Sequence, residues 1–162
     1  MAWLLLVGLA ILACFSFVLL FGAPYLPTLT PQVETALQLA NLMPGQTMIE
    51  LGCGDGKVLI AAAQTGVHAV GYELNPILAA IAWYRTRKFK GSVRVVWGNF
   101  WNKTWPEAEA IFTFLHPRFM KKLDTKIVQS SMQNVKLVSF AFTIPDREPV
   151  DEKNGVFLYR YE

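Results

Sequence analysis

The stretch Glu50-Leu51-Gly52-Cys53-Gly54-Asp55-Gly56 decides the fold of this 162-residue chain. It follows the apolar run Thr47 to Ile49 and leads into Lys57 to Ala63, so glycines crowd the turn between an expected strand and an expected helix. Glycine adopts positive φ values and lets a ligand approach the backbone closely, and the helix that follows has free N–H groups at its start. The turn therefore predicts a binding site for a nucleotide-like ligand.

The spacing of these glycines separates two classes of ligand. A dinucleotide-binding turn has the pattern G-x-G-x-x-G, which would put its third glycine where this chain has Lys57. Gly52, Gly54 and Gly56 follow the pattern G-x-G-x-G instead. No pyrophosphate is required at the helix, so we expect an uncharged or cationic ligand such as S-adenosylmethionine (SAM).

A carboxylate ends the next expected strand, His68 to Glu73. Glu73 lies about 21 residues after Gly52, the distance at which a βαβ unit places an acid beside a ribose. We expect Glu73 to accept hydrogen bonds from both ribose hydroxyls, and the alternative is a solvated acid at a strand end. Asn75 and Pro76 then open a helix as N-cap and first residue, and capping is the simplest role for Asn75.

Strand and helix patterns alternate from position 47 onward. We expect strands at 47–51, 68–73, 92–98, 110–115 and 135–142, and helices at 57–64, 76–88 and 118–130. This order predicts an α/β fold of the Rossmann-like, doubly wound kind with a mostly parallel sheet. A helix over 32–43 is expected to dock before the first strand. Pro149 to Glu152 and Val156 to Tyr161 are expected to form a closing antiparallel hairpin.

Two loops leave the expected carboxyl ends of strands, where doubly wound sheets bind ligands. After the third strand, we expect Asn99 to hydrogen-bond an adenine edge, with Phe100 or Trp101 stacking on the ring; packing within the loop is the alternative. After the fourth strand, His116 is the candidate to hydrogen-bond or deprotonate a nucleophile. A structural role for His116 before Pro117 is the alternative.

The amino-terminal segment is apolar and uncharged. As a helix, Trp3 to Phe21 would span about 28 Å, close to the thickness of a bilayer's hydrocarbon core. A cleaved signal peptide is the alternative, but the segment lacks a basic start and a small-x-small cleavage site. We expect a transmembrane anchor at 1–23, a Pro-rich linker at 24–31 and a ligand-binding domain at 32–162. Basic residues that suit anionic headgroups cluster at the end of the second expected helix: Arg85, Arg87, Lys88, Lys90 and Arg94.

Cysteine usage and charge exclude other classes of protein. Cys14 in the apolar segment and Cys53 in the glycine turn suggest neither a disulfide nor a metal site, so we expect no metal. Cys53 is expected to be a small, packed residue whose backbone N–H faces the ligand. The net charge of +3 is modest, and the chain has no basic-aromatic motif of the RNA-binding kinds, so no nucleic acid partner is expected.

Five motifs in order carry a family resemblance. They are E-L-G-C-G-D-G at 50–56, G-Y-E-L-N-P at 71–76, G-N-F at 98–100, F-L-H-P at 114–117 and S-F-A-F-T-I-P at 139–145. The set resembles the class I (seven-strand) SAM-dependent methyltransferases. G-Y-E-L-N-P, the preceding Thr30-Pro31, the absent helix after the fifth strand and the apolar amino terminus resemble a narrower group. These are the small membrane-anchored lysine methyltransferases whose mitochondrial members modify the ATP synthase c-subunit and the adenine nucleotide translocase, and their prokaryotic homologues.

The resemblance implies that residues 32–162 are a SAM-dependent methyltransferase domain acting on lysine side chains of a protein. It implies that the following residues bind the cofactor: Thr30, Glu50, Gly52, Cys53, Gly54, Gly56, Glu73, Leu74, Asn75, Asn99 and Phe100. In that assignment, Glu50 and the glycines hold the methionine end of SAM, Glu73 the ribose, and Asn99 with Phe100 the adenine. F-L-H-P departs from the motifs of enzymes that methylate amide or adenine nitrogens, which disfavours those substrates. His116 is the candidate base, ahead of Asp55.

The nature of the methyl acceptor is inferred only from the resemblance to the lysine methyltransferases. Two alternatives stay open: a methyltransferase for a small lipophilic molecule, and a non-catalytic SAM-binding subunit of a membrane complex. The absence of a basic, Ser-rich transit peptide indicates a prokaryotic source. Because SAM is made in the cytosol, we expect a single pass through the cell membrane with the catalytic domain on the cytosolic side, close to a membrane-embedded protein substrate. The sequence predicts neither the number of methyl groups transferred nor the oligomeric state.

Overall fold

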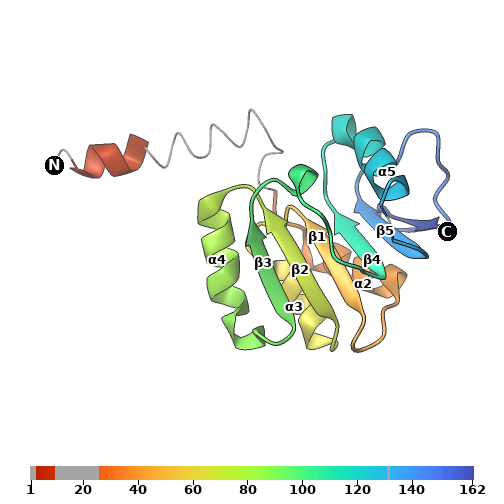
Figure 1. Cartoon of the computed structure of the whole chain (residues 1–162), viewed down its shortest axis with the longest axis horizontal. Helices are drawn as coiled ribbons and strands as arrows, with labels where there is room; N and C mark the ends of the chain where they lie inside the picture. The colour runs from red at the N-terminus through yellow and green to blue at the C-terminus, as the bar shows by residue number, and fades with distance from the viewer. Residues whose placement is uncertain (1–2, 10–25, 131) are drawn as a thin grey trace.

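A single mixed sheet forms the centre of the structure, a computed structural model that describes residues 3–9, 26–130 and 132–162 (Figure 1). Within these residues the strands follow the spatial order β3-β2-β1-β4-β5-β7-β6. The strands are β1 (Thr47–Leu51), β2 (His68–Glu73), β3 (Val93–Trp97), β4 (Ala110–Thr113), β5 (Val135–Phe140), β6 (Asp151–Lys153) and β7 (Val156–Tyr161). The helices are α2 (Thr30–Ala40), α3 (Lys57–Gln64), α4 (Pro76–Thr86) and α5 (Met120–Val128), with short 3₁₀ turns η1 (Arg87–Phe89), η2 (Phe100–Asn102) and η3 (Pro117–Phe119).

The parallel part of the sheet contains a switch in strand order. β1 pairs in parallel with β2 on one side and with β4 on the other, so Ile49 lies opposite both Val70 and Ile111. The chain runs outward from β1 to β3 and then crosses back to β4. Ligands of doubly wound sheets bind at such a point, beyond the carboxyl ends of the strands.

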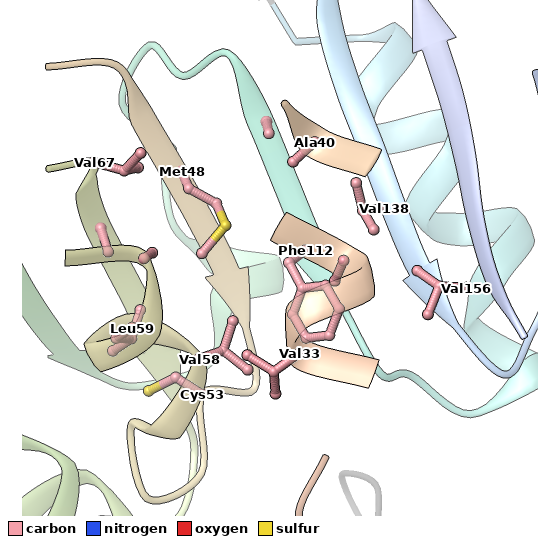
Figure 2. Packing of buried hydrophobic residues seen from close by; sticks show 14 of the residues in the cluster. Val33, Ala40, Met48, Cys53, Val58, Leu59, Val67, Phe112, Val138 and Val156 are labelled. Atoms are coloured by element: carbon pink, nitrogen blue, oxygen red, sulfur yellow. The ribbon is translucent and has the colours of Figure 1, made fainter. Parts of the chain in front are cut away.

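Helices cover the two faces of the sheet unequally. Because successive residues of a strand point to opposite faces, Met48 of β1 packs with α2 and α3, while Ile49 packs with α5. Figure 2 shows Val33 and Ala40 of α2 beside Phe112 and Val138 of the sheet. The second face is covered by α5 and by aromatic residues that follow β3.

The expected strands and helices are all present, and their ends differ where single residues leave the regular conformation. α2 begins at Thr30, because Pro31 is tolerated in a first helical turn, and it ends before Asn41, which has a φ of 42°. β5 ends two residues earlier than expected, because Ala141 has a φ of 68° and donates its N–H to Gly155.

The remaining corrections are also at element ends. The helix expected over 76–88 is α4 followed by η1, and the helix expected over 118–130 is η3 followed by α5. The strand expected over 110–115 ends at Thr113, and the strand expected over 92–98 spans 93–97 because Gly98 has a φ of 138°.

The closing hairpin is confirmed. β7 pairs antiparallel with both β5 and β6. Asn154 and Gly155 connect β6 to β7 with φ values of 55° and 71°, the conformation of a two-residue hairpin turn.

The expected membrane span, Trp3 to Phe21, lies mostly outside the described residues. Residues 3–9 are helical, and their large apolar side chains, such as that of Leu5, are exposed. Across 3–9, 26–130 and 132–162, no helix has the length and apolar character needed to cross a bilayer. The anchor at 1–23 and the domain limits stay predictions, and Thr30 and Pro31 of the expected linker belong to α2.

Candidate active site

A pocket of about 240 Å³ lies at the carboxyl ends of β1, β2 and β4. It is lined by residues 26–28, the glycine turn with the start of α3, the end of β2 with Leu78 of α4, the end of β4 with the residues that follow it, and Phe142 after β5. This is the switch point of the sheet, so the topology predicts the place of the pocket correctly.

The glycine turn is bonded to β2 by its backbone. Gly52 and Cys53 both donate their N–H groups to the carbonyl oxygen of Tyr72, at 2.9 Å each. Gly52 and Gly54 have φ values of 83° and 53°, a left-handed conformation that favours glycine. A Cβ atom at Gly52 would meet no atom within 4 Å. The turn therefore leaves open space on its pocket side, as a closely approaching ligand requires.

Gly56 has a different role from Gly52 and Gly54. It does not line the pocket. A Cβ atom at Gly56 would lie 3.3 Å from the Cα of Ala82 and 3.2 Å from the Cγ2 of Thr86. Gly56 thus has a packing role where α3 meets α4, and the cofactor contact expected of it stays a prediction.

Cys53 is buried, as expected, but its N–H does not face the pocket. That N–H donates to the carbonyl oxygen of Tyr72, so the expectation that it faces the ligand is wrong. The thiol packs so closely on Gly71 that a Cβ atom there would lie 2.8 Å from its Sγ. Burial, and then the charges of Glu50 and Glu73, raise the pKa of the Cys53 thiol, so it stays protonated and is a poor nucleophile.

Glu73 is only 7% exposed, so the alternative of a solvated acid is wrong. Its Oε2 accepts the N–H of Gly54 at 2.8 Å, and its Oε1 accepts the N–H of Asn75 at 2.8 Å. Burial raises the pKa of Glu73, and these backbone N–H groups oppose the shift. Each carboxylate oxygen can accept a second hydrogen bond. Glu73 lines the pocket, so it can still accept hydrogen bonds from the hydroxyl groups of a ligand.

Glu50 is the least satisfied carboxylate of the site. It lines the pocket, is 4% exposed, and its Oε2 has no hydrogen-bond partner. Burial raises the pKa of Glu50 well above its usual value, the charge of Glu73 raises it further, and the backbone amide of Leu59 opposes both. A buried carboxylate without a partner is costly, and a cationic ligand group in the pocket would supply that partner.

Asn75 is an N-cap, as its simplest role predicts. It is fully buried, and its Oδ1 accepts the N–H groups of Ile77 at 2.9 Å and Leu78 at 3.3 Å. Asn75 does not line the pocket, whereas the neighbouring Leu74 does.

A strap formed by residues 26–28 borders the pocket, and the sequence did not reveal it. Thr30 is exposed and lies outside the pocket lining, while Thr28 lies within it. Lys57 donates from its Nζ to the carbonyl oxygen of Thr28 at 3.0 Å. The only signal in the sequence was Lys57 itself, at the position that a dinucleotide-binding turn reserves for glycine.

The loop after β3 packs on the protein rather than lining the pocket. Asn99 uses its Oδ1 to accept the N–H of Trp101 at 3.0 Å, and Trp105 donates from Nε1 to the carbonyl oxygen of Phe100 at 3.1 Å. The rings of Phe100 and Trp101 lie 4.6 Å apart. Neither Asn99 nor Phe100 is among the residues that line the pocket, and the adenine contacts expected of them stay predictions.

His116 stands at the mouth of the pocket with one ring nitrogen engaged. It is exposed, and its Nδ1 accepts the N–H of Arg118 at 3.3 Å. A neutral ring in this arrangement carries its proton on Nε2, so Nε2 is a donor. The geometry supports a capping role for His116 more directly than a role as general base.

Known proteins resemble this chain in sequence and in fold. A family model described as the ANTKMT methyltransferase domain matches residues 50–151. A lysine N-methyltransferase of the ATP synthase c-subunit from Homo sapiens is 30% identical over 128 residues, which are 78% of this chain and 54% of that protein. A protein-lysine N-methyltransferase of Saccharolobus islandicus is 31% identical over 130 residues, which are 78% of this chain and 81% of that protein.

The matches differ in extent. The chain spans about half the length of the vertebrate relatives it matches. Among solved structures, an RNA methyltransferase from Salinibacter ruber in complex with S-adenosyl-L-homocysteine (SAH) has a TM-score of 0.76 at 26% identity, covering 84% of this chain and 92% of that one. Two more distant methyltransferase structures also contain SAH.

Proposed function

Because the chain belongs to the family of the ANTKMT methyltransferase domain, we propose that it is a SAM-dependent methyltransferase that N-methylates lysine side chains of a protein. The observation that carries the proposal is the presence of the unpartnered Oε2 of Glu50 and the open glycine turn in one pocket. Such a pocket suits a ligand that is cationic and lies close to the backbone. SAM has both properties and supplies an electrophilic methyl group.

The residues of the pocket divide between the parts of SAM by their chemistry. The buried carboxylate of Glu50 suits the cationic methionine end, and Gly52 leaves room beside it. The remaining lone pairs of Glu73 suit the ribose hydroxyls. Leu74 offers an apolar contact to the adenine, and residues 26–28 cover the pocket.

The acceptor lysine has to lose a proton before it reacts, because its ordinary pKa is about 10.4. Removal of water and a nearby positive charge both lower the pKa of an amine. The apolar residues that line the pocket after β4 and β5 exclude water from the place where an acceptor would enter. The amine lone pair then forms the new N–C bond while the C–S bond electrons stay on sulfur. With His116 engaged as a cap, the amine's proton goes to solvent, and positioning supplies most of the rate.

We also propose that the enzyme is held at a membrane by residues 1–23, with its domain on the cytosolic side and a membrane-embedded protein as substrate. The surface of α4 supports this placement. Ile81, Trp83 and Tyr84 are 41%, 62% and 60% exposed. The basic residues Arg87 and Lys88 follow in η1. Aromatic and basic side chains together suit the headgroup region of an anionic membrane.

Radiolabel from tritiated SAM tests the proposal. The full-length protein is incubated with membranes of a strain from which its gene has been deleted, and label is followed in protein, in the organic extract and in RNA. We expect label in a protein band. Glu73→Ala should abolish that label, and Glu107→Gln, which changes an exposed acid outside the pocket lining, should leave it unchanged. Label confined to the organic extract or to RNA would reject lysine as the acceptor.

A further inference from the structure

One segment of the domain is strongly basic and contains no acid. Residues 74–106, which form α4, η1, β3 and η2, include neither Asp nor Glu. The same segment holds four of the five Trp residues of the chain. Its six basic residues give it a charge of +6, twice the +3 of the whole chain. They are Arg85, Arg87, Lys88, Lys90, Arg94 and Lys103.

This segment forms one edge of the domain. β3 is the end strand in the spatial order of the sheet, and α4 packs beside it (Figure 1). α4 buries the side that carries Leu78 and Ala82. A helix that is apolar all round is normally covered on both sides, so the exposed side of α4 should have a partner. That side carries a shallow groove lined by Pro76, Ile77, Ala80, Ile81 and Tyr84.

The exposed side chains change in character along α4. Ile81 comes first, the aromatic Trp83 and Tyr84 follow, and Arg87 and Lys88 come directly after the helix in η1. The guanidinium carbon of Arg87 lies 3.7 Å from the centre of the Tyr84 ring. Apolar, aromatic and basic side chains therefore succeed one another within about 9 Å along the helix axis. We call Ile81, Trp83, Tyr84, Arg87 and Lys88 the α4 face.

The charge of the α4 face separates the partners that could cover it. A second copy of the same face would place Arg87 and Lys88 near their own counterparts, and like charges across an interface are costly. RNA would pair with the cations and stack on the rings, but it would leave Ile81 and the apolar groove without a partner. An anionic membrane suits all three kinds of side chain. Apolar groups enter the acyl boundary, aromatic rings lie at the headgroups, and cations meet the lipid phosphates.

The apolar part of the α4 face lies toward the pocket. α4 begins just after Leu74, and both Leu74 and Leu78 line the pocket. Trp97, 65% exposed at the carboxyl end of β3, donates from its Nε1 to the carbonyl oxygen of Leu74 at 3.2 Å. Arg87 and Lys88 follow the opposite end of α4. A bilayer that takes up the apolar half of α4 more deeply than the basic end therefore lies on the pocket side of the molecule.

We propose that the α4 face binds an anionic lipid surface as a contact separate from residues 1–23, and that this contact turns the pocket toward the bilayer. The proposal rests on the proposed membrane placement of the enzyme and adds the lipid class and the orientation. Residues 1–23 contain no Lys, Arg, Asp or Glu, so they do not select a lipid by its charge. Each Lys or Arg near an anionic surface raises binding about fivefold, so Arg87 and Lys88 give the α4 face that selectivity.

Quenching of tryptophan fluorescence by brominated lipid tests the contact without turnover. The full-length protein is reconstituted in vesicles of brominated phosphatidylcholine, alone or mixed with phosphatidylglycerol. The difference in quenching between each protein and its Trp83→Phe counterpart reports binding of the α4 face. This difference should be about threefold larger or more when phosphatidylglycerol is present, and Arg87→Gln/Lys88→Gln should remove the increase. Lys121→Gln/Lys122→Gln, the matched control, removes two exposed cations from α5 and should retain it.

Salt gives the same test without a variant. In about 1 M salt the Debye length is about 3 Å, so the Trp83 quenching of wild type should fall to its value in phosphatidylcholine alone. Equal quenching of Trp83 in the two kinds of vesicle, or an increase that persists in high salt, would overturn the proposal. A response of Trp83 to polyuridylate at physiological salt, with no response to anionic vesicles, would do the same and would identify RNA as the partner.

Trp97 tests the orientation. Because Trp97 lies at the pocket end of the edge, Trp97→Phe should also remove part of the quenching in anionic vesicles. Quenching of Trp83 with none of Trp97 would overturn the orientation.

The lipid contact and the proposed function fail separately. If Trp83 shows the expected preference for anionic vesicles but no lysine of any protein is methylated, the proposed function fails and the lipid contact stands. If lysine is methylated while Trp83 shows no such preference, the proposed function stands and the assignment of the α4 face fails.

Discussion

Glu50→Gln should weaken SAM binding and at the same time stabilise the ligand-free protein. The substitution keeps the shape of a side chain whose Oε2 is buried without a partner. It removes the charge that a cationic ligand would pair with. A hydrogen bond to a charged group contributes about 1.5 to 3 kcal/mol, so the dissociation constant of SAM should rise by about 10- to 150-fold.

The effect on stability has the opposite sign. In the ligand-free protein the buried Oε2 of Glu50 lacks a partner, which costs about 1 to 3 kcal/mol once the carboxyl is ionised. The neutral amide of Gln avoids most of that cost, so Tm should rise by about 3 °C for each kcal/mol recovered. A residue that destabilises the ligand-free protein and increases the affinity for the ligand is characteristic of a binding site.

The pH dependence identifies Glu50 as the cause. Its pKa in the folded protein is raised, so the folded state holds the proton more tightly than the unfolded state does. This contribution to stability is present at low pH and is lost as pH rises through the folded-state pKa. The Tm advantage of Glu50→Gln should therefore grow as pH rises through the folded-state pKa and should vanish as pH falls toward 4.5, the ordinary carboxyl value.

Two measurements check this reasoning. Calorimetric titration gives the SAM affinity of wild type, Glu50→Gln and the exposed-site control Glu107→Gln, and thermal unfolding without ligand between pH 5 and pH 8 gives Tm. The reasoning is refuted if Glu50→Gln binds SAM as wild type does, or if it lowers Tm with the pH dependence unchanged.

Three further predictions concern the borders of the pocket. Gly56→Ala should lower the free energy of unfolding by about 1 to 3 kcal/mol and leave the SAM affinity of the folded protein unchanged. Gly52→Ala should reduce the free energy of SAM binding by more than it reduces the free energy of unfolding. Denaturant unfolding measures the stability of each variant, and calorimetric titration measures its SAM affinity. Lys57→Met removes the hydrogen bond to Thr28, so SAM affinity should fall by about two- to tenfold and residues 26–28 should be cleaved faster by protease, and equal cleavage would count against the strap. His116→Asn should reduce the methylation rate by less than about tenfold without altering its pH profile, because loss of a general base costs about 100-fold or more.

Much of the fold followed from local patterns. The glycine turn between an apolar strand and a helix sets the βαβ start, and the regular alternation after it specifies a parallel sheet; β1, β2 and α3 have the predicted bounds. Element ends were harder to predict. Asn41 and Ala141 have positive φ values and donate their N–H groups to the carbonyl oxygens of Leu37 and Gly155. The spacing of apolar residues in the sequence does not predict such hydrogen bonds.

The candidate site was predictable where a residue's role depends on the strand that carries it. Glu50 and Glu73 end up in one pocket because β1 and β2 are neighbours. The roles of Gly56 and Asn99 were harder to predict. A glycine or an asparagine that follows a strand packs against the protein or caps a turn as often as it contacts a ligand. The ring contact between Phe114 and Phe142 depends on the register between β4 and β5, which the sequence does not state.

A methyl group with a heavy isotope tests the central claim most directly. The full-length protein is given SAM with a trideuterated methyl group and membranes from a deletion strain, and peptides are sequenced by mass spectrometry. The account predicts deuterated methyl groups on the side-chain nitrogen of one or more lysines with wild type and none with Glu73→Ala. Deuterium that appears only in lipid, RNA or other residues, from a protein that binds SAM normally, would contradict it.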